Sequence, residues 1–124
     1  MLRGTGIVFH MVWSSPRLGP YWREVAETLS NRCGVELPLD PRLFLLSYLG
    51  AVEGDRYTKL CITFALFYAR RKIFLRWRGP DHPTRSSWLG TINRVLPLYR
   101  IMYGSRNCPA KFDKIWSSWI DSSG

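Results

Sequence analysis

The stretch 56–78, RYTKLCITFALFYARRKIFLRWR, constrains the fold more than any other segment. It contains neither Gly nor Pro, so nothing in it stops a helix of about twenty residues. At 100° per residue its apolar side chains spread round the helix, and Phe67 and Phe74 fall on one of several apolar sides. A helix that is apolar nearly all round is buried among other helices. We therefore expect its first half in the core, and its second half on the core with cationic side chains reaching outward.

Three further helices are predicted from apolar residues that recur at helical spacing. They span about 20–32, 85–103 and the segment that begins with Pro109. Gly34 is expected to end the first as its C-cap, and Thr84 to begin the second as its N-cap. Pro97 is expected to kink or break that second helix, and Gly104 to end it.

The remaining segments are shorter. Residues 7–13 form either a short strand or an extended arm, and residues 35–40 are extended. Residues 43–49 form a helical turn or a strand, and Asp55 or Thr58 caps the central helix. The sequence thus predicts one small, mainly α domain over residues 1–124, with about four helices and an extended N-terminal arm.

The net charge of +9 is spread unevenly. Residues 1–55 hold five Lys/Arg against six Asp/Glu, whereas residues 56–124 hold thirteen against three. This asymmetry indicates a polyanionic partner, with RNA or DNA first and an anionic membrane surface second. A basic surface that binds nothing stays open as the alternative, because net charge reports on association and not on fold.

Cations and aromatic residues gather at the end of the central stretch and continue into the next helix. The predicted phosphate contacts are Arg70, Arg71, Lys72, Arg76, Arg78 and Arg85. Because consecutive helical residues point about 100° apart, residues 70–72 cannot all face one phosphate track. Exposed aromatics would stack bases, but we expect the tryptophans of these helices in the core.

Nothing in the sequence predicts a catalytic, metal or cofactor site. His10 and His82 have no cysteines at metal-ligand spacing, and no nucleophile motif or paired carboxylates are present. The three cysteines are few and widely spaced, which argues against a disulfide framework and for a reduced, intracellular protein. Cys61 is interpreted as a small core residue. We expect no enzyme activity.

The sequence predicts no signal peptide and no membrane span. The N-terminal residues have no long apolar run and no small-residue cleavage site, so we expect a protein that is not secreted and lies in the nucleus or cytoplasm. The apolar run 60–69 is too short to span a bilayer, which requires about 20 residues.

Several segments together resemble a known family. FHMVWSSPRLGPYWREV resembles the H-x-x-W-x-C-P segment in the C-terminal region of polyproteins from LINE-type non-LTR retrotransposons, after the reverse transcriptase domain. The later segments GVELPLDPRLFLL, YARRKIFLRWR, SSWLGTINRVLPLYRIMY and CPAKFDKIWSSWI are similar to the rest of that region. The resemblance covers nearly the whole chain and implies a fragment of such a protein, without its polymerase and endonuclease domains.

One departure from the family matters for chemistry. The resemblance implies a zinc site built from an upstream Cys pair, a His and a Cys. His10 matches that His, but Ser15 stands where the Cys would be, and no Cys precedes His10. A Ser hydroxyl is a poor zinc ligand beside thiolate and imidazole, so we expect no zinc site.

Two functions follow as hypotheses. In the first, the chain is a non-catalytic tail whose basic surface binds the RNA or DNA of the element. In the second, it is a structural or protein-interaction remnant that packed against other domains of the parent reverse transcriptase protein. A basic helix lying on an anionic membrane is a third, weaker hypothesis.

Overall fold

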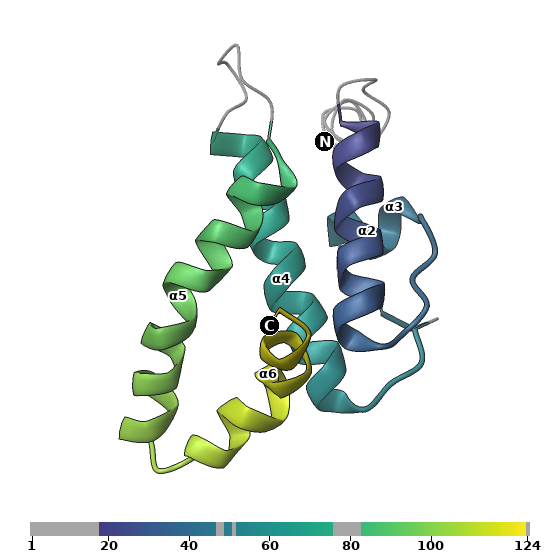
Figure 1. Ribbon diagram of the computed structural model, residues 1–124. Coiled ribbons are helices and arrows are strands. Elements are labelled where there is room, and N and C mark those ends of the chain that lie inside the picture. Colours follow the sequence, from purple (N-terminus) through teal and green to yellow (C-terminus); the bar gives the residue numbers. More distant parts are fainter. Residues whose placement is uncertain (1–17, 47–48, 51, 76–82, 124) are drawn as a thin grey trace, which may run out of the picture.

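The computed structural model describes residues 18–46, 49–50, 52–75 and 83–123, which form helices and contain no strand (Figure 1). The prediction of a small, mainly α domain is confirmed, and the predicted N-terminal arm lies outside the described residues. The described part holds four long helices and a short one: α2 (Gly19–Cys33), α3 (Pro41–Leu46), α4 (Arg56–Leu75), α5 (Arg85–Ser105) and α6 (Pro109–Ser123).

The predicted helix ends are confirmed at three places. Gly34 ends α2 in the left-handed conformation (φ 67°), which glycine adopts without a Cβ penalty. The Thr84 hydroxyl accepts a hydrogen bond from the Ser87 amide at 3.1 Å, which caps α5. The carboxylate of Asp55 accepts one from the Thr58 amide at 2.8 Å, so Asp55 caps α4.

Residues 43–49 are predicted as a helical turn or a strand, and residues 43–46 belong to helix α3. The segment 35–40 has no helix or strand, and a helix then begins with Pro41, whose missing N–H costs nothing in a first turn. The Asp40 carboxylate accepts a hydrogen bond from the Arg42 amide at 2.9 Å and pairs with its guanidinium at 3.1 Å. These bonds to Asp40 stabilise the start of α3.

Helix α5 differs from the prediction at Pro97 and at its end. It continues as one helix through Pro97, because this proline and Asn93, whose carbonyl loses its helical partner, are both exposed to water. Gly104 lies inside the helix and does not end it. The turn is made by Asn107 (φ 59°), a residue type that tolerates the left-handed region.

The core lies where α2, α5 and α6 pack round α4, with α6 folding back from the far end of α5 (Figure 1). Four tryptophans are at most 1% exposed, as expected for core residues: Trp22, Trp88, Trp116 and Trp119. Trp119 contacts both Trp88 and Trp116 edge to face. Trp13 and Trp77 lie outside the described residues.

Helix α4 receives hydrogen bonds from two neighbouring helices. The Tyr21 hydroxyl of α2 donates to the Ala69 carbonyl at 2.8 Å, and the Trp88 indole N–H of α5 donates to the Ala65 carbonyl at 2.9 Å. Both bonds are buried, and both acceptors are the carbonyls of alanines, whose small side chains permit close approach. These bonds fix the rotation of α4 about its axis.

The burial of α4 corrects the sequence prediction. Its buried side chains form one stripe with steps of one, three and four residues: Cys61, Ile62, Ala65, Leu66, Ala69 and Ile73. The opposite side is open, because Phe67 is 47% exposed and Phe74 is 55% exposed. The helix is therefore not buried all round, although Cys61 is a core residue as predicted.

Candidate nucleic-acid interface

The predicted phosphate contacts that the structure describes lie towards one end of the helical bundle. Figure 1 shows the C-terminal end of α4 and the N-terminal end of α5 at that same end. Arg76 and Arg78 lie outside the described residues. The structure places the remaining four at the end of α4 and the start of α5: Arg70, Arg71, Lys72 and Arg85.

Arg70 is half-buried and already has a structural role. Its guanidinium donates a hydrogen bond to the Phe44 carbonyl at 3.0 Å, which attaches α3 to α4. Burial lowers the pKa of Arg70 because desolvation disfavours the charged form. The side chain remains a cation, but one of its N–H donors is already bonded to the protein.

Arg71 is exposed and stands between two accessible aromatic rings. Phe67, Arg70, Arg71 and Phe74 line an open hollow of about 400 Å³ on the outer side of α4. No carboxylate lies within ion-pair distance of Arg71 in the described ranges. This hollow combines a cation with apolar rings, the pairing that the sequence suggested for this region.

Lys72 and Arg85 complete the described part of the predicted set. Lys72 is half-buried on another side of α4, as the 100° step between consecutive residues requires. Arg85 is exposed, and its Nε lies 3.9 Å from Glu24 Oε2. With both side chains 48% exposed, this pair is weak and screened by salt.

Further cations line the outer surface of α5. Arg94, Arg100 and Arg106 are exposed, and the Arg94 guanidinium donates to the Thr91 hydroxyl at 3.2 Å. The Arg100 guanidinium lies 5.1 Å from the centre of the Phe112 ring. Exposed cations therefore continue along α5 and at its end, but on more than one side of the helix.

A second basic cluster, at the start of α4 and of α6, was not predicted. Arg56 lies 4.9 Å and Lys114 lies 5.4 Å from the centre of the Tyr57 ring. A hydrogen bond from Arg56 lowers the pKa of the Tyr57 hydroxyl, and the charges of Arg56, Lys114 and Lys111 lower it further. The spacing of Lys111 and Lys114 puts them on one side of α6, but only the fold brings them to Arg56.

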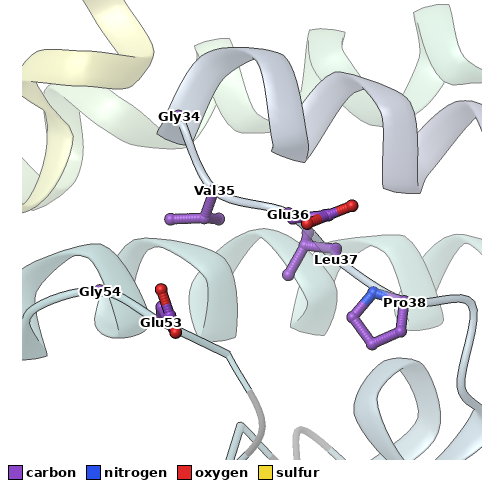
Figure 2. Close-up of a pocket in the computed structure, with 7 residues that line it drawn as sticks. All are labelled: Gly34, Val35, Glu36, Leu37, Pro38, Glu53 and Gly54. Carbon is purple, nitrogen blue, oxygen red and sulfur yellow. The ribbon is translucent and has the colours of Figure 1, made fainter.

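A groove of about 680 Å³ lies between residues 34–38 and the segment with Glu53 and Gly54. Figure 2 shows Val35 and Leu37 pointing from one segment towards the other. Glu36 and Glu53 are both exposed in this groove, and no cation lines it. Two carboxylates at one groove repel phosphate, so it does not belong to the basic interface.

Metal-binding side chains do not gather in the described part of the chain. No group of three or more His, Cys, Asp or Glu residues there has the proximity to hold a metal ion. His10, Ser15 and His82, on which the prediction of no zinc site rests, lie outside the described residues. That prediction stays a prediction.

Two of the cysteines come together in the fold, although 28 residues separate them in sequence. Cys33 is half-buried at the end of α2, and Cys61 is buried in α4. Both are free thiols. A hydrogen bond from the Cys61 thiol lowers the pKa of Cys33, and the nearby Arg32 charge lowers it further, while burial opposes them. Sequence spacing holds no signal for this contact.

Comparison of the chain with family models, with curated proteins and with solved structures finds no match. Of the described helices, none has both the length and the apolar content to cross a membrane.

Proposed function

We propose that this chain is a non-catalytic helical module that binds RNA or DNA, as the C-terminal tail of a LINE-type reverse transcriptase protein would. The observation that carries the proposal is Arg71, an exposed cation between two accessible aromatic rings. It lies in the half of the chain that holds thirteen Lys/Arg against three Asp/Glu. Arg85, at the start of α5, supplies a second exposed cation near the same end of the bundle.

The physical reason is the release of counterions. Each phosphate that a cation neutralises frees a condensed ion, so affinity falls as salt rises. The described cations are spread over the outer side of α4 and along α5, which suits a long polyanion better than a compact one. Arg70 contributes less than its neighbours because one of its N–H groups is held by Phe44.

A protein-interaction remnant is the second candidate. It is favoured by Leu98 and Ile101, which lie three residues apart on α5 and are 64% and 68% exposed. Two exposed apolar residues at this spacing lie on one side of the helix and offer a small apolar contact surface to a partner. Arg94, four residues before Leu98, lies on the same side of α5, however, so this surface is mixed with a cation instead of separate from the basic residues.

The test is a titration of the full chain against fluorescein-labelled single-stranded RNA and duplex DNA, followed by anisotropy. The label belongs on the nucleic acid because the four described tryptophans are buried and would report binding poorly. Between about 50 and 200 mM salt, log affinity should fall linearly with log salt, with a slope of about 0.7 per phosphate on single strands and 0.9 on duplex. No binding to either at low salt would exclude the proposal.

Matched variants locate the surface. The double substitution Arg71→Gln and Arg85→Gln should reduce the salt slope on RNA by about 1.4, because two phosphate contacts are lost. Arg23→Gln removes one exposed charge from α2, in the half of the chain with balanced charge, and should leave the slope unchanged. If Arg23→Gln reduced the slope by half as much as the double substitution, which removes twice the charge, the effect would come from net charge alone.

A further inference from the structure

The starts of α4 and α6 bring three exposed cations to one half-buried tyrosine, Tyr57. The Arg56 guanidinium lies 4.9 Å and the Lys114 ammonium lies 5.4 Å from the centre of the Tyr57 ring. Lys111 lies three residues before Lys114 on the same side of α6, and its charge also lowers the pKa of the Tyr57 hydroxyl. Two helices thus place positive charge from three side chains beside one phenol group.

These cations have no counterion in the part of the chain that the structure describes. No carboxylate there lies within ion-pair distance of Arg56, Lys111 or Lys114. Asp55 accepts a first-turn amide of α4 at 2.8 Å, and Asp113 points about 100° away from Lys114. Like charges near one ring repel each other, and the start of each helix adds the positive end of its dipole. An anion between the cations would relieve both effects.

The donors of this cluster suit a compact anion. The Tyr57 ring already has two cations against it, so it is a poor platform for stacking a base. Its hydroxyl accepts a hydrogen bond from Arg56 Nη2 at 2.9 Å, and no described residue accepts the proton of that hydroxyl. A guanidinium fork, two ammonium groups and a phenol O–H can all donate to the oxygens of one phosphate group.

We propose that Arg56, Tyr57, Lys111 and Lys114 form a binding site for a phosphate monoester group. Such a group carries about 1.5–2 negative charges at pH 7, whereas a phosphodiester inside a strand carries one, so three cations favour the monoester. Arg56 lies 15 residues before Arg71, which is about 22 Å along α4. The site is therefore separate from the hollow beside Arg71, and the inference does not rest on the proposed function.

The test is a titration of the full, ¹⁵N-labelled chain with methyl phosphate and with dimethyl phosphate, at pH 8 and constant ionic strength, followed by the amide signals in NMR spectra. Methyl phosphate should shift the amides of the four site residues together and to saturation. It should bind at least 5-fold more tightly than dimethyl phosphate, because one added charge at 4 Å from a cation in water contributes a factor of about 5.

Matched variants assign the binding to the cluster. Arg56→Gln and Lys114→Gln should each weaken methyl phosphate binding by about 5-fold, and either one decides the test if the other folds poorly. Tyr57→Phe keeps the ring and should weaken binding by about 10-fold, since a hydrogen bond to a charged group is lost. Arg23→Gln removes one exposed charge from α2, which contributes nothing to the site, and should leave the affinity unchanged.

A second readout is the Tyr57 hydroxyl itself. The three cations lower its pKa, so a bound dianion should raise that pKa again, which ¹³C NMR of the labelled tyrosine ring would follow. An unchanged pKa at saturating methyl phosphate would place the anion elsewhere and overturn the inference. Equal affinity for methyl and dimethyl phosphate, or an equal effect of Arg23→Gln and Lys114→Gln, would also overturn it, because both indicate attraction by net charge alone.

The source of the phosphate group is decided with RNA strands that end in a 5′-phosphate or a 5′-hydroxyl. Tighter binding of the phosphorylated strand that is lost in Lys114→Gln assigns the site to the end of a nucleic acid strand. Equal binding of the two strands, with methyl phosphate still bound, assigns it to a small phosphate monoester. Failure of all strands to bind at low salt would exclude the proposed function and leave the site for methyl phosphate standing.

Discussion

Arg70 and Arg71 are neighbours of the same type, but the structure predicts that replacing each by Met changes a different property of the protein. Arg70→Met keeps the aliphatic stem but removes the guanidinium that donates to the Phe44 carbonyl at 3.0 Å. Arg71→Met removes an exposed guanidinium from the hollow on α4. The first change should lower stability, and the second should lower affinity for nucleic acid.

The size of the stability effect follows from the contact. A hydrogen bond that involves a charged group contributes about 1.5–3 kcal/mol. Freedom regained by the side chain offsets part of this, since an ordered Arg loses up to about 2 kcal/mol of entropy and Met also loses some. We expect Arg70→Met to lower the free energy of unfolding by about 1–2 kcal/mol. For a chain of this length that corresponds to a fall in Tm of about 3–10 °C.

The assay is thermal melting of both variants by circular dichroism at 222 nm, paired with RNA anisotropy at low salt. Arg71→Met should melt within about 0.5 kcal/mol of the unchanged chain, as exposed substitutions do. Its RNA salt slope should fall by about 0.7, for one lost phosphate contact. If Arg71→Met destabilised the chain more than Arg70→Met, the reasoning about the α3–α4 contact would be refuted.

Three further predictions concern the ends of helices and the paired thiols. Thr84→Ala removes the cap of α5 and should cost about 1 kcal/mol in a urea melt, with Thr84→Ser restoring it. The pKa of Asp55 is lowered by the amide that it caps, so its contribution to stability is present above its ordinary value of 3.8 and is lost as pH falls below that value. Asp55→Asn should flatten this part of the stability profile in acid, and an unchanged profile would contradict it. Iodoacetamide should alkylate Cys33 more slowly once Cys61→Ala removes the hydrogen bond that lowers the pKa of Cys33, as peptide mass spectrometry would show. An equal or faster rate would contradict that contact.

The pattern of apolar residues was sufficient to predict the buried side of a helix where that helix has a single apolar side. In α6 the predicted inward residues are all buried: Phe112, Ile115, Trp116 and Trp119. The same holds for α2, whose predicted residues Trp22, Val25, Ala26 and Leu29 are buried. Local periodicity predicts such faces because a single stripe leaves only one orientation that buries it.

The candidate site was predictable only as a region. Sequence alone indicated a basic end of the central helix beside the next one, and the structure places Arg71 and Arg85 there. It did not distinguish Arg70, which bonds to the backbone of α3, from Arg71, which is free to meet a ligand. Periodicity predicts the tryptophans of these helices in the core but does not indicate which other rings reach water, and the structure leaves Phe67 and Phe74 exposed.

The sequence by itself determined the helical class, the helix ends at Gly34 and Thr84, and the charge imbalance between its halves. Each of these depends on residues close together in the chain or on composition alone. Tertiary structure decided which side of α4 meets water, because that helix has apolar residues all round and only its neighbours select among them. It also brought Cys33 to Cys61 and Arg56 to Lys114, since such contacts depend on how whole helices pack and not on any local spacing.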